Sequence, residues 1–169
     1  MKTTIQTAFL ASFLFFVCNL SFSQGNKLSY YDSAGTMPLF RYYNTSGALF
    51  NPGSLNKKNT TVLIYFRTDC PYCAGEADMI SQNINDFPSV DFIFLTREID
   101  TASIKAFAEN HKLENNQHVK FLLDKDKLYY TYYKAKYIPS IHIYDKNNKL
   151  KLFTQNVLSR EEMSIYVAD

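Results

Sequence analysis

Continuous apolar runs mark the positions where the chain is predicted to form strands. Residues 61–66 and 90–96 are almost entirely β-branched, aromatic or aliphatic, which is typical of strands buried on both faces of a sheet. Shorter runs at 119–123 and 140–144 predict two more strands, and residues 149–154 are expected to pair back on the last of these as a hairpin. The run at 61–66 is expected to be the central strand.

Segments that can form helices separate these strands. A helix is predicted from Pro71 to about Asn85, because proline is favoured at the first helical position, where its missing N–H would be unpaired anyway. Asp100 and Thr101 are expected to cap a second helix. One face of that helix would be formed by Ile104, Phe107, Ala108 and His111.

The two ends of the apolar pattern complete the predicted fold. Residues 39–50 are expected to form two short strands around a turn at 44–47. A tyrosine-rich helix or turn is predicted at 127–137, and Ser159 with Glu162 forms a capping-box pattern before a short last helix. Strands that alternate with helices indicate a layered α/β domain, with parallel pairing at the centre and antiparallel strands at one edge.

The first residues have the pattern of a secretory signal peptide. A positively charged start is followed by a short apolar block and by small residues up to Ser23. We expect cleavage after Ser23, which would leave residues 24–169 as one domain of ordinary length. Two alternatives are lipid attachment at Cys18, which the large Val17 before it disfavours, and an uncleaved anchor. The protein is therefore expected to be exported, and either periplasmic or membrane-tethered facing the periplasm.

The charges of the chain are almost balanced. It has 18 Lys and Arg residues against 16 Asp and Glu residues, a net charge of +2. Lys2 would leave with the signal peptide, so the exported chain is nearly neutral. Bulk charge therefore gives no support to a nucleic-acid or anionic-membrane partner.

Cys70 and Cys73 are the main chemical signal of the sequence, because they follow the predicted central strand and open the predicted helix. If Cys18 leaves with the signal peptide, they are the only cysteines of the exported protein, in a compartment where thiols become oxidised. A disulfide between them would close a very small loop and remove little entropy from the unfolded chain, so it is a poor structural crosslink. We therefore expect reversible redox chemistry.

The helix start is expected to give the two thiols different roles. Unpaired backbone amides and the helix dipole favour negative charge on Cys70, whereas Cys73 lies one turn further in. The thiolate is the attacking species in disulfide exchange. Cys70 is therefore predicted to attack a substrate disulfide and form a mixed disulfide, which Cys73 resolves.

Two other interpretations of the cysteine pair were weighed. A zinc site needs further ligands, but there is no second CxxC, and the histidines at 111, 118 and 142 have no ligand-like spacing to the pair. A merely structural disulfide is disfavoured by the small loop. No bound metal or organic cofactor is implied. His142 and most of the tyrosines at 129–137 are interpreted as structural.

The order of strand, CxxC pair, helix and later Ile138-Pro139-Ser140 before a hairpin resembles the thioredoxin superfamily. In that family the later proline is cis. The resemblance implies that the loop at Pro139 faces the cysteines and that the backbone of Ile138 hydrogen-bonds an incoming substrate as an added strand. The alternative is an ordinary proline at the start of a strand. The implied fold is thioredoxin-like, with a central mixed β-sheet flanked by helices.

Within that superfamily, residues 36–169 most resemble the exported TlpA/ResA-like thiol–disulfide oxidoreductases. The N-terminal β-hairpin is similar to an addition found in this family, and residues 90–123 are similar to its strand-and-helix insertion. Glu76, three positions after Cys73, matches a glutamate that many members carry beside the active site. This carboxylate either exchanges protons with the resolving thiol or is a solvated acid in the first helical turn.

The positions next to Cys70 set this chain apart from those relatives. Asp69 stands where they usually carry Trp, and the chain has no Trp. An ionised carboxylate there would oppose formation of the Cys70 thiolate, so a fairly reducing potential is expected. Pro71-Tyr72 is the dipeptide familiar from glutaredoxins and is interpreted as local tuning of the helix start and the potential. Tyr72 is also a candidate substrate contact.

The sequence therefore predicts an extracytoplasmic oxidoreductase that exchanges disulfides with protein substrates. As the TlpA/ResA resemblance implies, it is expected to be a reductase that receives electrons from a membrane thiol donor. The alternatives are a disulfide oxidant or isomerase, and a non-catalytic binding module of thioredoxin fold. A peroxiredoxin is not indicated. The active site of those enzymes resembles a Pro…Thr/Ser-x-x-Cys pattern, and this chain has Leu63 in place of the Pro and Arg67 in place of the Thr or Ser. The oligomeric state is left open.

Overall fold

The structure is a computed structural model that describes residues 35, 37, 41–133 and 135–168. The expected signal peptide and the first two residues of the predicted N-terminal hairpin lie outside these residues. The described elements are, in chain order, β1 (Tyr43–Asn44), β2 (Thr60–Tyr65), α1 (Pro71–Gln82), β3 (Val90–Thr96), α2 (Thr101–Asn110), β4 (Val119–Leu123), α3 (Leu128–Tyr133), β5 (Ser140–Tyr144), β6 (Leu150–Thr154) and α4 (Arg160–Val167). Short 3₁₀ helices occur at Pro52–Ser54 and Ile84–Asp86.

The strands form one mixed sheet in the order β1-β4-β3-β2-β5-β6. β2 is central: it runs parallel to β3 and antiparallel to β5. β3 and β4 are also parallel, and β5 pairs antiparallel with β6 at one edge. Every residue of β2 and β3 is buried, which explains why their sequences are continuously apolar rather than alternating. The predicted thioredoxin-like architecture is confirmed.

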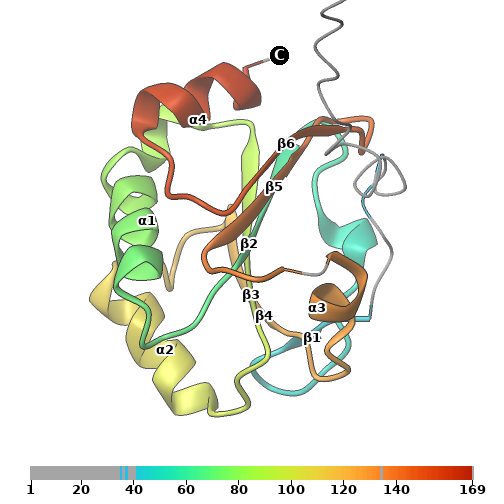
Figure 1. Ribbon diagram of the computed structural model, residues 1–169, viewed down its shortest axis with the longest axis vertical. Helices are drawn as coiled ribbons and strands as arrows, with labels where there is room; N and C mark the ends of the chain where they lie inside the picture. The colour runs from blue at the N-terminus through green and yellow to red at the C-terminus, as the bar shows by residue number, and fades with distance from the viewer. Residues whose placement is uncertain (1–34, 36, 38–40, 134, 169) are drawn as a thin grey trace, which may run out of the picture.

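Helices cover both faces of the sheet (Figure 1). α1, α2 and α4 lie on one face, and the short α3 lies on the other. The first face holds the larger core, in which the rings of Phe66 and Phe107, and of Phe94 and Phe121, have centroids 5.0 Å apart. The second face holds a smaller core that includes Tyr42, Leu63, Tyr65, Ile93, Leu95, Leu122, Tyr129, Tyr133 and Ala135. Burying these rings stabilises the two layers on the sheet.

The N-terminal hairpin is shorter than predicted. Its pairing consists of β1 and one bridge between Tyr43 and Leu49. The turn itself is present: Gly47 has φ 86° and donates its N–H to the Asn44 carbonyl (2.9 Å). Leu49 is 58% exposed, so its side chain gains no burial that would favour a longer strand. β1 pairs instead with β4 and covers part of that edge of the sheet.

The predicted helix boundaries agree with the structure at their N-termini. Asp100 caps α2, and the Ser159–Glu162 capping box begins α4. α1 ends earlier than Asn85, because Asn83 leaves helical geometry with φ −118°. His111 stands at the end of α2 and is only half-buried, so it contributes less to the buried face than expected.

Candidate active site

Cys70 is held at the N-terminus of α1 by the loop that leaves the central strand. It is the N-cap residue, with extended backbone angles, and Pro71 occupies the first helical position. The Cys70 sulfur accepts the backbone N–H of Cys73 at 3.2 Å, one of the amides that a helix start leaves unpaired. A sulfur in this place receives both a hydrogen bond and the positive end of the helix dipole, which favour the thiolate.

The two cysteines differ in how deeply they are buried. Cys70 is 9% exposed, whereas Cys73 is fully buried, and both are free thiols with their sulfur atoms 2.6 Å apart. The Cys73 thiol donates toward the Cys70 sulfur. Burial and, after it, this hydrogen bond raise the pKa of Cys73 well above its usual range. Cys73 therefore keeps its proton at neutral pH while Cys70 faces the surface.

Glu76 lies one turn further along α1 and is fully buried. Its Oε2 accepts the backbone N–H of Leu158 at 2.8 Å, whereas Oε1 is buried with no hydrogen-bond partner. Burial raises the pKa of Glu76 to about 7, and the charge of Glu76 contributes to the raised pKa of Cys73. The alternative of a solvated acid is wrong, because α4 and the loop before it cover this part of α1.

The segment before β5 lies across from Cys70. The Ile138–Pro139 peptide bond is cis, as the resemblance implied. The Ile138 carbonyl oxygen is 3.9 Å from the Cys70 sulfur, and Ile138 itself is half-buried. Ser140, which begins β5, pairs with Tyr65 at the end of β2. The pairing of β2 with β5 thus brings the segments that carry Cys70 and Ile138, which are distant in the sequence, to the same end of the sheet.

Asp69 is not an isolated negative charge. Arg67 Nη2 is 2.5 Å from Asp69 Oδ2, and Arg67 Nε is 3.7 Å from Glu98 Oε1. Glu98 Oε2 also accepts the backbone N–H of Thr68 at 3.1 Å. The Arg67 cation partly compensates the Asp69 charge, so the expected effect of Asp69 on Cys70 is weaker than the sequence alone indicated. No sequence signal pointed to Glu98, which lies 31 positions after Arg67.

Three exposed apolar side chains belong to the CxxC motif or stand next to a residue that contacts its surroundings. Tyr72, inside the CxxC motif, is 70% exposed, and Tyr137, next to Ile138, is 67% exposed. Ile99, which follows Glu98, is 80% exposed. Of these three residues, only Tyr72 lies within the motif and could be named from the sequence.

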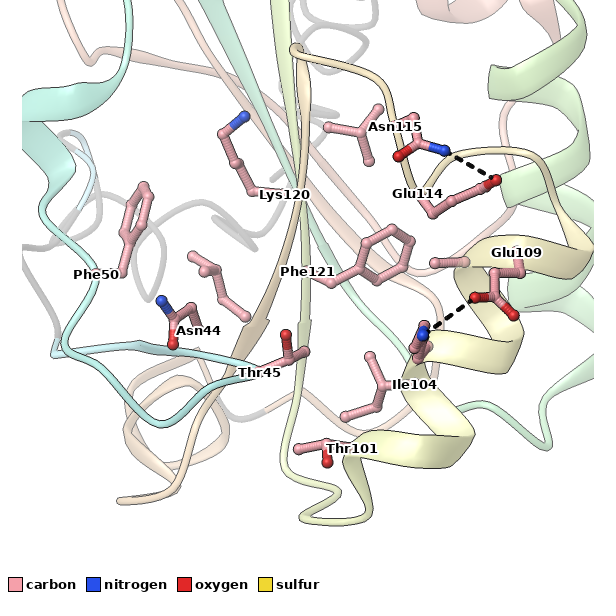
Figure 2. A pocket seen from close by; sticks show the side chains of 14 residues that line it. Asn44, Thr45, Phe50, Thr101, Ile104, Glu109, Glu114, Asn115, Lys120 and Phe121 are labelled. Carbon is pink, nitrogen blue, oxygen red and sulfur yellow. Dashed lines mark hydrogen bonds and ion pairs between the residues drawn. The ribbon is translucent and has the colours of Figure 1, made fainter.

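One cavity in the described part of the chain lies away from the cysteine pair. It has a volume of about 960 Å³ and lies between α2, β4 and the segment around β1. Figure 2 shows Phe121 and Ile104 on one side of β4, and Lys120 and Phe50 on the other. No residue of the cysteine pair, Glu76 or the Ile138 segment lines this cavity. The cysteine site is therefore separate from this cavity.

The described residues contain no group of three or more His, Cys, Asp or Glu side chains that could hold a metal ion. His142 is fully buried among aromatic rings, and burial lowers its pKa to about 3. His118 and His111 each lie against a single aspartate. The histidines thus occupy separate structural positions.

Comparison with known proteins gives relatives that are secreted. The soluble secreted antigen MPT53 of Mycobacterium tuberculosis is 28% identical over 126 residues, which cover 73% of this chain and 69% of that protein. A solved structure of a secreted M. tuberculosis disulfide oxidoreductase, described as homologous to E. coli DsbE, is 27% identical with a TM-score of 0.64. The match covers 76% of this chain and 94% of that chain.

StoA from Bacillus subtilis has the same fold, with 17% identity, a TM-score of 0.58, and coverage of 75% of this chain and 94% of that chain. No helix in the parts of the chain described by the structure is long and apolar enough to cross a membrane. The secreted M. tuberculosis neighbour is a disulfide oxidoreductase of the same fold, which confirms the resemblance drawn from the CxxC motif and its surroundings. The AhpC/TSA family model matches residues 34–153, and the chain belongs to the AhpC/TSA family.

Proposed function

We propose that the protein is an extracytoplasmic thiol–disulfide oxidoreductase that exchanges disulfides with protein substrates through Cys70 and Cys73. One observation carries this proposal: the Cys70 sulfur sits at the N-cap of α1 and accepts the Cys73 amide, with the Cys73 thiol buried directly behind it. A surface thiolate and a protected second thiol within reach are the requirements for a two-step exchange. Leu63 and Arg67 still distinguish the site from that of a peroxiredoxin.

The two electrons of the reaction come from the two thiols alone. The Cys70 thiolate attacks one sulfur of the substrate disulfide, which forms a mixed disulfide and releases the first substrate sulfur as a thiolate that takes up a proton. Cys73 loses its proton and attacks the Cys70 sulfur, which breaks the mixed disulfide and releases the second substrate thiolate. The substrate disulfide gains two electrons, and Cys70 and Cys73 end as a disulfide.

We assign Glu76 as the base that accepts the proton of the Cys73 thiol. A buried thiol with a raised pKa needs a base close by before it can attack. Glu76 shares α1 with Cys73, has a pKa of about 7, and keeps one carboxylate oxygen free of hydrogen bonds. A carboxylate with this pKa can accept and return a proton near neutral pH.

The substrate is expected to lie between Cys70 and the Ile138 segment. An extended peptide there would pair with the backbone of Ile138 as an added strand beside the sulfur. Pro139 follows Ile138 and is buried, whereas Tyr72 is exposed and available to contact the substrate. Pro71 and Asp69 would influence the potential through the helix start and the local charge.

The direction of electron flow that we propose is reduction of the substrate, with electrons supplied by a membrane thiol donor. This follows from the TlpA/ResA resemblance and from Asp69, whose charge opposes the thiolate even when Arg67 compensates part of it. The competing activity is a disulfide oxidant or isomerase. Equilibration with glutathione buffers separates the two: a potential near about −120 mV, typical of the strongest disulfide donors, would contradict a reductase.

Substrate trapping tests the exchange itself. The Cys73→Ser variant should accumulate a mixed disulfide between Cys70 and a client protein, because the resolving thiol is missing. The Cys70→Ser variant is the matched control and should trap nothing. If a variant with both substitutions keeps full activity in the exporting cell, the protein is a binding module rather than an oxidoreductase.

A further inference from the structure

Tyr129 joins the two strands that carry the exchange site, from the opposite face of the sheet. Its ring stacks on Tyr65 with a centroid distance of 4.2 Å and an interplanar angle of 10°. Its hydroxyl lies 3.1 Å from the Ser140 carbonyl oxygen and 3.0 Å from Ser140 Oγ. Tyr65 is the last residue of β2, five positions before Cys70, and Ser140 is the first residue of β5. One side chain therefore contacts both strand ends.

The helix that carries Tyr129 is itself fixed to the sheet. The buried Asp124 carboxylate accepts the backbone N–H groups of Leu128 (2.8 Å) and Tyr129 (3.0 Å). The Asp124 N–H donates to the carbonyl of Thr96 at the end of β3 (2.7 Å). Tyr129 and Ser140 are both fully buried, so their contacts are shielded from competing water. Asp124 thus holds the start of α3, and with it Tyr129, against the sheet.

The hydroxyl of Tyr129 also lies 2.9 Å from Nδ1 of the buried His142. His142 follows Ser140 by two positions on the same face of β5. A tyrosine hydroxyl can donate one hydrogen bond and accept others, so it can serve Ser140 and His142 together. These contacts fix the first three residues of β5, immediately after the Ile138 segment.

We propose that Tyr129 is a positioning residue of the exchange site, which holds the Ser140 backbone and thereby places the Ile138 backbone beside Cys70. The inference rests on the proposed function and deepens it, because it concerns how that site receives an extended peptide. Ile138 and Ser140 are separated by a single residue, and the Ile138 oxygen is 3.9 Å from the Cys70 sulfur. A shift at Ser140 would therefore displace the backbone edge against which the peptide aligns.

This role distinguishes two kinds of substrate. A peptide disulfide depends on pairing with the Ile138 backbone, whereas a small aromatic disulfide such as 5,5′-dithiobis(2-nitrobenzoate) needs only the Cys70 sulfur. Tyr129→Phe keeps the ring stacked on Tyr65 and removes only the hydroxyl. Loss of the hydrogen bonds from the Tyr129 hydroxyl to Ser140 should lower the rate of exchange with the peptide disulfide by roughly three- to tenfold, because the peptide binds more weakly. The rate of exchange with the small disulfide should stay the same.

The test is a single-turnover reaction of the reduced protein with each substrate: two extended peptides joined by one disulfide, and the aromatic disulfide. Tyr133→Phe is the matched control, since it removes an equally buried hydroxyl on the same helix, bonded to Tyr144 rather than to Ser140 (2.6 Å). It should lower stability similarly without changing the ratio of the two rates. Ser140→Ala removes the contact between Ser140 Oγ and the Tyr129 hydroxyl and keeps the one to the Ser140 carbonyl oxygen. It should lower the ratio of the peptide rate to the small-disulfide rate, as Tyr129→Phe does, but by less.

The outcomes separate this inference from the proposed function. A selective loss with the peptide in Tyr129→Phe, absent in Tyr133→Phe, supports the positioning role. Equal changes with both substrates, or the same selective loss in Tyr133→Phe, overturn it while the exchange activity stands. If Tyr129→Phe does not fold, an unchanged ratio in Ser140→Ala overturns the role. A wild-type protein that reacts with neither substrate overturns the proposed function together with the inference.

Discussion

Replacing Glu76 with glutamine should flatten the pH dependence of the free energy of unfolding. Burial raises the pKa of Glu76 in the folded protein from 4.5 to about 7, whereas the unfolded chain keeps the ordinary value. At pH values between 4.5 and about 7, the folded state therefore binds more protons than the unfolded state. Protonation of Glu76 thus stabilises the folded state. This stabilisation is fully present below the pKa of Glu76 in the unfolded chain and is lost as the pH rises through its pKa in the folded protein. The difference between 4.5 and about 7 corresponds to about 3 kcal/mol.

Glutamine keeps the shape of the side chain and has no charge to desolvate. Its oxygen can still accept the Leu158 N–H, and its amide group takes the place of Oε1, which has no hydrogen-bond partner. The variant should therefore be similar to or less stable than wild type at about pH 5, where Glu76 is protonated. Between about pH 5 and pH 8 it should gain about 3 kcal/mol relative to wild type.

Urea unfolding of both dithiol proteins across this pH range measures the difference. Asp124, whose pKa is also raised by burial, titrates in both proteins and cancels in the comparison. Cys73 titrates above this range, because burial raises its pKa. Two parallel curves of unfolding free energy against pH would refute the reasoning, since they would mean that Glu76 ionises alike in the folded and unfolded states.

Three further substitutions test the surroundings of the site and the fold. Arg67→Gln should make the cysteine pair more reducing and Asp69→Asn less reducing, each by no more than a few-fold in the equilibrium with glutathione, because the ion pair is solvent-exposed; shifts in the same direction would contradict this. Phe94→Ala, at a fully buried position, should lower the free energy of unfolding in urea by about 3–5 kcal/mol, and a loss well below this would mean that the core can collapse around the gap. Ser159→Ala should cost about 1 kcal/mol by removing the α4 cap, and an unchanged urea midpoint would refute it.

The elements that could be predicted from the sequence are those set by neighbouring residues. β3, β4 and β5 have the predicted bounds, because each is a mostly apolar run that ends at a polar segment. The start of α1 follows from Pro71 after a cysteine, and the start of α2 from Asp100, which accepts amides two and three positions ahead. The returning segment of the N-terminal hairpin did not form a strand, because pairing needs a face to bury and Leu49 has none.

Part of the candidate site was also local. The polarity of the cysteine pair was predicted from the helix start, and the structure places the Cys70 sulfur on the Cys73 amide while burying Cys73. The charges near Cys70 could be predicted only in part, because Arg67 and Asp69 lie just before the motif, whereas Glu98, the second carboxylate that pairs with Arg67, comes from the loop after β3. Whether a charge is compensated depends on what the fold brings alongside it.

The sequence by itself determined most of the strands, the helix starts and the place of Cys70 at the start of α1, because each depends on residues within one or two helical turns of one another. Only the tertiary structure decided the environment of Glu76, which is buried through contact with Leu158, 82 positions away. It also placed Tyr129 against Ser140 on the far face of the sheet. A pKa and a backbone position depend on which groups exclude water and supply hydrogen bonds, and these groups meet only when distant segments pack together.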